Sequence, residues 1–530
     1  MPSDHVNFAY MFNLLYSVYS IPNIILPFFA GTIVDYLGSA QCMILFSVFT
    51  FLGQIILSVG VKDGNWILML LGRFFYGLGG ESIGVASSTL NSNLFEGQEL
   101  ALAFGINMAI SRSGSVFNNF LSPLFAGLVS IPFAFYIGIM MNCATVFCSL
   151  TIQHLQTKTN QTRLGQEDSL TTINEAIIEN SAQAKKPKEE GRSMNQGRTT
   201  SVVLEQPLSD TCIVSKFGSL FWLISFACCV IYGCILPFNN VASGILLQRN
   251  YFTNPPIDCT LKFPNQCSFG ELQPFGENPS TDSTGLSCPI DENTAPVLPL
   301  SIHVMDYNST EFAWKKTSYI YDTLDASDID CTDPFWSKAC TQDYCQAQRK
   351  ATEKTGRIMS IPYIMSIFLA PCLGHVVDRV QQRAILSIIA SLIFVLVHMI
   401  LACTQSSPIL PLIQQGIAYA LFASVIWPSI PLIIDAKYVG TAFGTIVAIQ
   451  NIGLATFPMI IASIYNKSHH QFIPNVEYFF AALAACGLLA GIIIHVIDQR
   501  TGGRLNGRNR EESVIDDTEH LSTPLLNSIE

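Results

Sequence analysis

The chain has 530 residues, of which 49% are hydrophobic and only 13% are charged, and its mean hydropathy is +0.38. This composition excludes a soluble globular protein of the same size and is typical of a protein that crosses a membrane several times. The formal net charge of −11 hides an asymmetry, because basic residues gather in the polar stretch 154–215 and in the tail 498–530.

Apolar runs long enough to cross a bilayer, which takes about 20 helical residues, predict eleven spans and therefore an all-α polytopic membrane protein. The first run lacks the basic start and the small-residue cleavage site of a signal peptide, so we assign it to the helix bundle. The predicted spans are 10–36, 41–60, 66–92, 98–122, 130–153, 216–248, 352–377, 383–404, 408–434, 439–465 and 474–497.

The two basic segments, 154–215 and 498–530, predict the orientation of the spans. Positively charged flanks mark the cytoplasmic side of a membrane protein. The stretch 154–215 mixes Gln, Asn, Ser, Lys and Glu with few aromatic residues, a composition that predicts a disordered cytoplasmic linker.

The polar stretch 251–350 holds six of the sixteen cysteines and the sequon Asn308-Ser309-Thr310. Six clustered cysteines predict three disulfides with fifteen alternative pairings, and the sequon predicts a glycan on Asn308. Both modifications require the lumenal side of the membrane. The alternative is a chance sequon among unpaired cysteines. The six are Cys259, Cys267, Cys288, Cys331, Cys340 and Cys345.

An internal repeat relates the two halves of the chain. The segment "SIPNIILPFFAGTIVDYLG" at 20–38 is echoed by "SIPYIMSIFLAPCLGHVVDRV" at 360–380, and "LAFGINMAISRSG" at 102–114 by "TAFGTIVAIQNIG" at 441–453. Two homologous helix bundles in the same orientation are a parallel-repeat plan that membrane transporters use.

Two loops of the repeat resemble the signature loop of the major facilitator superfamily, which faces the cytoplasm in that family. The first copy departs from the pattern at Tyr36, where a basic residue is usual. We expect these loops to gate the cytoplasmic side through Gly31, Asp35 and Gly38 in the first copy and Gly374, Asp378 and Arg379 in the second.

The resemblance implies the domain plan. One span precedes the signature loop in the first half and two precede it in the second, so the first helix of the family is missing. We expect a truncated gene model or a misplaced start at Met1, with a genuine eleven-helix carrier as the alternative. The expected units are an N-terminal bundle at 1–153, the cytoplasmic linker at 154–215, a C-terminal bundle at 216–497 with the lumenal cysteine-rich insertion 251–350, and a cytoplasmic tail at 498–530.

Four segments resemble the lysosomal dipeptide transporter branch of this superfamily: "NLLYSVYSIPNIILPFFAGTIVD", "LGRFFYGLGGESIGVA", "ELALAFGINMAISRSGS" and "YVGTAFGTIVAIQNIGLA". The resemblance implies transport of dipeptides from the lumen of a lysosome or vacuole to the cytosol, with the plasma membrane as the alternative location. It also implies a glycosylated accessory membrane subunit, with a homodimer as a further assembly. Membrane lipid surrounds the bundle, and we expect no nucleic acid partner.

Two charged residues are expected near the membrane midplane. Glu81 lies about 16 Å, and Arg112 about 18 Å, from the cytoplasmic ends of their helices at 1.5 Å of rise per residue. Ionisable groups at this depth are costly and usually face a cavity or a partner. A guanidinium suits a substrate carboxylate and a carboxylate suits an ammonium group, and in the resembling branch these two residues hold opposite ends of a dipeptide. The alternative is a salt bridge that ties two helices together.

Three further residues, Tyr419, Trp427 and Asn118, are weaker candidates for the same substrate site, with helix packing as the alternative. We find no phosphate-binding loop, zinc spacing or nucleophile elbow, so we expect neither an enzyme nor a cofactor or metal. The span 216–248 holds no acidic residue, which favours uniport. The alternatives are a proton-coupled carrier of amino acids or small organic anions, and a carrier-like receptor or scaffold.

Overall fold

The computed structural model of the chain describes residues 5–95, 99–183, 213–255 and 341–506, together with short pieces between 256 and 340. The N-terminal bundle is made of five long helices. They are α1 (His5–Leu37), α2 (Ser39–Asp63), α3 (Trp66–Leu94), α4 (Leu100–Leu128) and α5 (Ile131–Gln183).

The C-terminal bundle begins after the linker. Its helices are η2 (Ile213–Lys216), α6 (Ser219–Leu246), η3 (Leu247–Tyr251), α9 (Gln342–Met359), α10 (Ile361–Val380), α11 (Arg383–Cys403), α12 (Ile409–Ile433), η5 (Ala436–Tyr438), α13 (Val439–Lys467), α14 (Asn475–Arg500) and η6 (Arg504–Asn506). Three two-residue strands, β1 (Cys267–Ser268), β2 (Ile302–His303) and β3 (Ile320–Tyr321), form a small sheet in the order β1-β2-β3. Strand β1 is parallel to β2 and β3 is antiparallel to it, with Ile302 opposite both Cys267 and Tyr321.

Each of the eleven predicted spans coincides with helix. Within the described residues, nine helical segments are long and apolar enough to cross a membrane. The helix α3, which carries Arg73 and Glu81, is not among them, and α1 contributes only the shorter apolar segment Pro22–Leu37. The predicted span 352–377 is two helices that meet at Ser360, since Pro362 lies in the first turn of α10 and disfavours a continuous helix before it.

The helix α5 differs from the sequence-based expectation at its C-terminal end. It continues to Gln183, thirty residues into the stretch 154–215 that was predicted to be disordered. The backbone of 154–183 is helical although its composition is polar, so the prediction of disorder is wrong for this part of the linker. Residues 184–212 lie outside the described residues.

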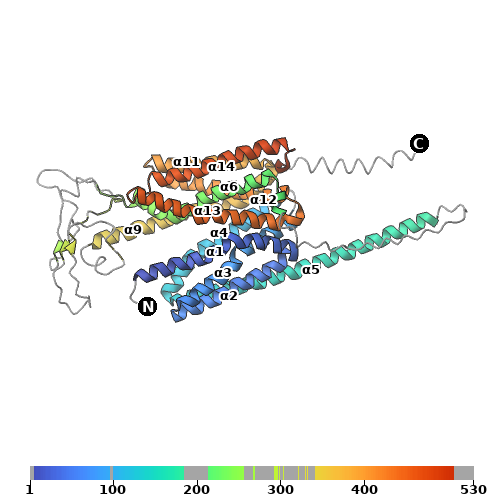
Figure 1. The fold of residues 1–530 in the computed structure, drawn as a ribbon, viewed down its shortest axis with the longest axis horizontal. Coiled ribbons are helices and arrows are strands. Elements are labelled where there is room, and N and C mark those ends of the chain that lie inside the picture. The colour runs from blue at the N-terminus through green and yellow to red at the C-terminus, as the bar shows by residue number, and fades with distance from the viewer. Residues whose placement is uncertain are drawn as a thin grey trace.

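The two bundles lie side by side and cross-pack in two equivalent pairs (Figure 1). Helix α1 packs along α13, and helix α4 packs along α10. Because α1 and α10 are repeats of each other, and α4 and α13 likewise, the two contacts are related by the internal repeat. The strands and α9 lie at one end of the molecule, and the far end of α5 lies at the other. We call these the lumenal and the cytoplasmic ends, following the predicted orientation.

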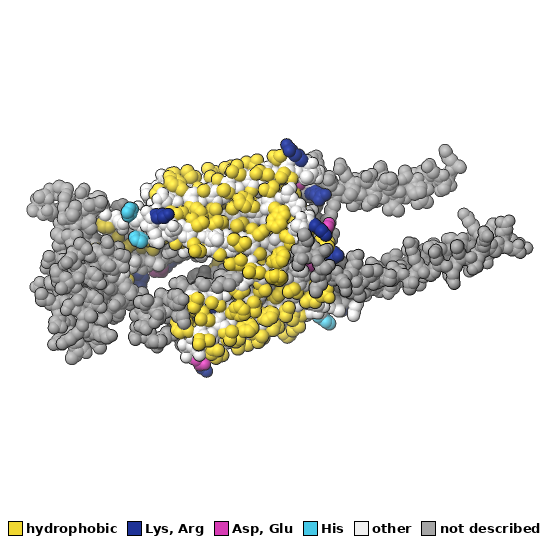
Figure 2. Space-filling model, in the orientation of Figure 1, with side chains coloured by type: hydrophobic (Ala, Val, Ile, Leu, Met, Phe, Trp, Pro, Cys, Tyr) yellow, Lys and Arg dark blue, Asp and Glu magenta, His cyan; other side chains and the backbone are white. Residues whose placement is uncertain are grey.

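The helices differ strongly in how much of their surface is buried. In the most apolar windows of α6 and α12, 67% and 72% of the residues are buried, whereas in α5 only 6% are. Large apolar side chains such as Met140 and Phe147 on α5 point outward, and the surface between the two ends is largely apolar (Figure 2). This band is the surface that a bilayer covers.

Candidate functional site

The first signature loop makes a contact across the two bundles. The carboxylate of Asp35, at the end of α1, accepts hydrogen bonds from the backbone N–H of Gly440 at 2.6 Å and of Thr441 at 2.7 Å. It also accepts one from the hydroxyl of Thr441 at 2.6 Å. These donors belong to the first turn of α13, where N–H groups have no helical partner and the helix dipole favours negative charge.

The second signature loop repeats this contact with the bundles exchanged. Asp378 on α10 accepts from the backbone N–H of Ala101 at 3.1 Å and of Leu102 at 2.9 Å, in the first turn of α4. Its carboxylate also pairs with Arg383 at 3.3 Å. The predicted gating residue Arg379 is exposed, so the basic partner of this loop is Arg383, which sequence reasoning missed.

The signature glycines allow the backbones to touch at these crossings. A Cβ atom added to Gly31 would clash with the carbonyl of Gly440, and one added to Gly374 would clash with the carbonyl of Ala101. Gly38 instead precedes α2 in the turn after α1, with a φ of 92° that favours glycine. We call the two crossings, with their aspartates and glycines, the cytoplasmic gate. At both crossings the two bundles are in contact in this structure.

The predicted substrate residue Arg112 connects the two bundles near their middle. Its guanidinium on α4 donates a hydrogen bond to the hydroxyl of Tyr419 on α12. It lies 5.0 Å from the centre of the Tyr419 ring and 5.9 Å from that of Tyr363 on α10. The Nε atom of Arg112 is buried and has no hydrogen-bond partner within the described part of the chain. The guanidinium therefore keeps donors for a further acceptor.

Trp427 belongs to the same aromatic group but does not touch Arg112 directly. Its indole N–H donates to the hydroxyl of Tyr232 on α6 at 2.6 Å, and the Tyr232 ring lies 6.1 Å from that of Tyr419. We call Tyr232, Tyr363, Tyr419 and Trp427 the aromatic group. Tyr232 and Tyr363 were not predicted from the sequence, because a tyrosine in an apolar span gives no signal of the direction in which it points.

The predicted partner Glu81 is half-buried on α3. No hydrogen bond or ion pair joins it to another residue among those that the structure describes. The salt bridge between Glu81 and Arg112, the alternative to a substrate clamp, is thus absent from this conformation of the described residues. Tyr19 on α1 lies within electrostatic reach of Glu81, and its ring packs against Gly80.

The remaining predicted residues are placed as follows. Asn118 is exposed on α4, and its side chain accepts a hydrogen bond from Ser122 of the same helix at 2.8 Å, so it joins neither Arg112 nor Glu81 here. Cys331 and Cys345 form a disulfide. Asn308 and the cysteines Cys259, Cys288 and Cys340 lie outside the described residues, and Cys267 is described only as backbone in β1.

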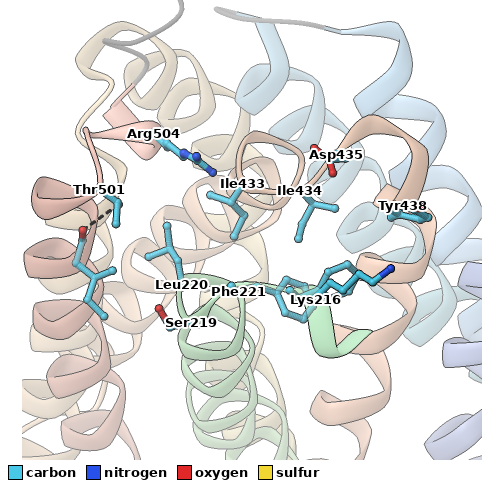
Figure 3. Close-up of a pocket in the computed structure, with 13 residues that line it drawn as sticks. Lys216, Ser219, Leu220, Phe221, Ile433, Ile434, Asp435, Tyr438, Thr501 and Arg504 are labelled. Atoms are coloured by element: carbon cyan, nitrogen blue, oxygen red, sulfur yellow. Dashed lines mark hydrogen bonds between the residues drawn. The ribbon is translucent and has the colours of Figure 1, made fainter. Parts of the chain in front are cut away.

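A separate cavity lies at the cytoplasmic end of the C-terminal bundle (Figure 3). Its volume is about 420 Å³, and it is lined by Lys216, Phe221, Ile434, Asp435 and Arg504 among others. None of the predicted substrate residues lines it. By contrast, the surface between the two bundles is hollowed toward the lumenal end (Figure 2). The bundles are thus in contact at the gate and are parted toward the end that we call lumenal.

Sequence comparison gives matches along most of the chain. A family model described as Major Facilitator Superfamily matches residues 5–249 and 347–526. The lysosomal dipeptide transporter MFSD1 of Homo sapiens is 25% identical over 521 residues, which cover 96% of this chain and 83% of that protein. Its counterpart in Danio rerio is 24% identical over 506 residues, covering 93% and 80%.

Solved structures with the same fold are more distant in sequence. The transporter FucP in the outward conformation aligns with a TM-score of 0.54 at 10% identity, covering 93% of this chain and 91% of that one. The proton:xylose symporter XylE aligns with a TM-score of 0.53 at 12% identity, covering 93% and 86%. At this identity the likeness concerns the fold alone.

Proposed function

Since the chain belongs to the Major Facilitator Superfamily, we propose that it carries dipeptides from the lumen to the cytosol as a uniporter with alternating access. It is a membrane transporter and a multi-pass protein of the lysosomal membrane. The similarity to the lysosomal dipeptide transporters supports the choice of substrate. The accessory subunit, the homodimer and the glycan on Asn308 stay predictions.

The observation that carries the proposal is the position of Arg112. Its guanidinium comes from the N-terminal bundle and is held by Tyr419 of the C-terminal bundle, so a ligand bound to it would touch both bundles. Such a ligand would sense the relative movement of the bundles that alternating access requires. A planar guanidinium with free donors suits a carboxylate, which it can bind through two parallel hydrogen bonds.

Glu81 supplies the opposite charge. A carboxylate that has no hydrogen bond or ion pair among the described residues suits the ammonium group of a zwitterion at this depth, since an unpaired intramembrane charge otherwise has a high cost. In the proposed complex Arg112 binds the C-terminal carboxylate of the dipeptide and Glu81 binds its N-terminal ammonium. The peptide backbone is then recognised irrespective of its side chains.

The test is uptake of labelled dipeptides into proteoliposomes, with matched ligands and variants. An N-acetylated dipeptide and a dipeptide C-terminal amide should each lose affinity for the wild type by about 30-fold or more, as expected when one partner of a buried charge pair is removed. In Glu81→Gln, N-acetylation should have no further effect, and in Arg112→Lys, amidation should have a much smaller effect. Each variant would thereby identify the ligand group that its residue binds.

The control variant is Glu353→Gln on α9, which removes an exposed carboxylate that pairs with Arg357 of the same helix and should transport normally. Wild-type uptake of the acetylated or amidated ligand at the rate of the free dipeptide would contradict the clamp. A folded wild-type protein that carries no dipeptide at all would contradict the proposed function and would favour the alternative of a carrier-like receptor or scaffold.

A further inference from the structure

Three chemically active side chains meet in the core of the C-terminal bundle, away from the proposed dipeptide site. They are Cys234 on α6, His398 on α11 and Glu477 on α14, and each has an exposed fraction of 0%. The Nδ1 atom of His398 lies 2.7 Å from Oε2 of Glu477. Its Nε2 atom lies 3.1 Å from Sγ of Cys234. We call these residues the Cys-His-Glu cluster.

The surroundings of the cluster are apolar. The rings of Phe238 and Phe480 each lie 5.2 Å from the imidazole of His398. An ionisable group inside a membrane costs at least about 2.5 kcal/mol on insertion scales, and well-packed apolar residues often hold helices together as strongly as a buried pair. A role in helix packing therefore does not account for the cluster, and a functional role is the better explanation.

The hydrogen-bond roles follow from the chemistry of the three groups. An ionised Glu477 can only accept, so Nδ1 of His398 carries the hydrogen that lies between them. In a neutral imidazole Nε2 then carries a lone pair, and the thiol of Cys234 donates to it. The same sulfur lies 3.6 Å from the carbonyl oxygen of Phe480, which is a second acceptor for the thiol.

One polar atom of the cluster has no partner. Oε1 of Glu477 is buried and makes no hydrogen bond within the described part of the chain. A buried carboxylate oxygen without a donor is unusual in a folded protein and calls for an explanation. A cluster that exchanges a proton gives one, because the unpaired atom leaves the charge of the carboxylate available to an incoming proton.

We propose that the Cys-His-Glu cluster binds one proton from the lumen, and that this proton controls how α6 is held against α11 and α14. The incoming proton forms an N–H bond at Nε2 of His398 and displaces the hydrogen bond from the thiol. The thiol of Cys234 then donates to the carbonyl of Phe480 instead. The step is a proton transfer alone, and no group is oxidised or reduced.

The charge of the cluster changes from negative to neutral in this step. A fixed positive charge, Arg249 in η3, is buried and lies within electrostatic reach of Glu477. Its guanidinium donates to the carbonyl oxygens of Leu401 at 3.0 Å and Thr404 at 2.6 Å, at the end of α11. Protonation of the cluster weakens the attraction between Glu477 and Arg249, and so the attachment of the end of α6 to α14, while the bonds of Arg249 to the carbonyls of α11 remain.

Other titratable groups on the packed elements are already engaged or distant. On α11, Arg383 pairs with Asp378 at the cytoplasmic gate, and on α12, Tyr419 binds Arg112. Tyr478 of α14 is exposed and contacts Cys403. The remaining titratable groups of α6, η3, α9, η5, α13, α14, η6 and the loop after α13 are Cys228, Cys229, Tyr232, Tyr251, Asp343, Tyr344, Arg349, Lys350, Glu353, Lys354, Arg357, Lys437, Tyr438, Tyr465, Lys467, His469, His470, Cys486, His495, Asp498, Arg500 and Arg504, whereas Cys345 is held in its disulfide.

Helix α6 links the cluster to the substrate site. Pro237 lies inside α6 less than one turn after Cys234, and a proline cannot donate to the carbonyl four residues earlier, which makes this turn the natural bending point of the helix. Tyr232, two residues before Cys234, binds Trp427 in the aromatic group. A change in the hydrogen bonding of Cys234 therefore acts at the point where α6 can bend and where α6 contacts the aromatic group around Arg112.

The first experiment measures the proton site without any dipeptide. Infrared difference spectra of the full chain in liposomes, between about pH 8 and about pH 5, should show a shift of the S–H stretching band of Cys234 as its acceptor changes. The shift should be absent in Cys234→Ser, His398→Gln and Glu477→Gln. Cys228→Ser is the matched control, because Cys228 on the same helix lies 3.7 Å from the amide oxygen of Gln450, which does not titrate. The shift should persist in that variant.

The second experiment measures dipeptide uptake against lumenal pH, and for this readout alone the inference rests on the proposed function. The pH dependence of the wild-type rate should be flattened in His398→Gln and Glu477→Gln and preserved in His154→Gln, which removes an exposed histidine on α5. An S–H band that does not shift in the wild type, or that shifts equally in His398→Gln, would overturn the proton site. Loss of the band shift with an unchanged uptake profile would overturn its control of α6. Absence of uptake in every protein would count against dipeptide transport, while the infrared result still decides this inference.

Discussion

Removal of the Asp35 carboxylate should open the cytoplasmic gate. Asp35→Asn keeps the size of the side chain but places an amide N–H₂ group where two backbone donors of α13 and the Thr441 hydroxyl now meet a carboxylate. The variant loses the charge that the start of α13 favours, and one of its two acceptor atoms becomes a donor. The equivalent change at the other crossing is Asp378→Asn.

The expected size of the effect follows from these contacts. A hydrogen bond to a charged group contributes about 1.5–3 kcal/mol to stability. When the gate opens, water forms hydrogen bonds with the separated carboxylate and with the donors of α13. We therefore assign about 2 kcal/mol to the whole contact rather than to each hydrogen bond. This value corresponds to about a 30-fold shift of the equilibrium toward the cytoplasm-open state. The two crossings share no residue, so the double variant should shift it by about 4 kcal/mol.

Spin labels at positions 154 and 500 would report this equilibrium, since His154 on α5 and Arg500 on α14 are exposed near the cytoplasmic ends of the two bundles. Pulsed electron–electron double resonance, in a background without the exposed native cysteines, should show that a longer distance between the labels becomes more populated in Asp35→Asn. Asp435→Asn is the matched control, because this carboxylate is exposed in the turn just before α13 and no hydrogen bond to it is present among the described residues.

An unchanged distance distribution in both single variants and in the double variant would refute the reasoning. It would mean that other contacts between the bundles hold the cytoplasmic end closed without the aspartates. An equal shift in Asp435→Asn would also refute it, because the effect would then come from the net charge of this end of the molecule.

Two further variants test the packing at the gate and the lumenal segment. Gly374→Ala places a methyl group against the carbonyl of Ala101 and should weaken the closed gate by about 1–3 kcal/mol, seen as the same change in the spin-label distance. Gly84→Ala, where the added atom meets open space, should leave the distance unchanged. An unchanged distance in Gly374→Ala would count against close backbone contact. Cys331 and Cys345 close a loop with a sequence separation of 14, so loss of their disulfide should cost the fold of this segment about 3 kcal/mol. A non-reducing peptide map should recover the two cysteines joined while the exposed Cys486 is alkylated, and alkylation of all three without reductant would contradict the pairing.

Some site residues could be found from the sequence because the signal was local. Asp35 and Asp378 stand at equivalent places in two repeats, and Glu81 and Arg112 are rare charges in apolar runs. His398 and Glu477 had a signal of the same kind, since both lie in strongly apolar helices, but nothing in the sequence showed that they face each other. Arg383 was missed because a basic residue at the start of a span reads as an ordinary flanking charge.

The sequence by itself determined the helical spans, the repeat and the positions of the unusual charges, because each depends on residues that are close together in the chain. Only the tertiary structure decided which helices are central and which residues meet. The most apolar windows of α5 and α12 have the same mean hydropathy of 1.7, yet 6% of one and 72% of the other is buried. Lipid tails are as apolar as a protein core, so hydropathy does not distinguish a helix face toward lipid from one toward other helices. The contact of Arg112 with Tyr419, 307 residues further along the chain, depends on that choice.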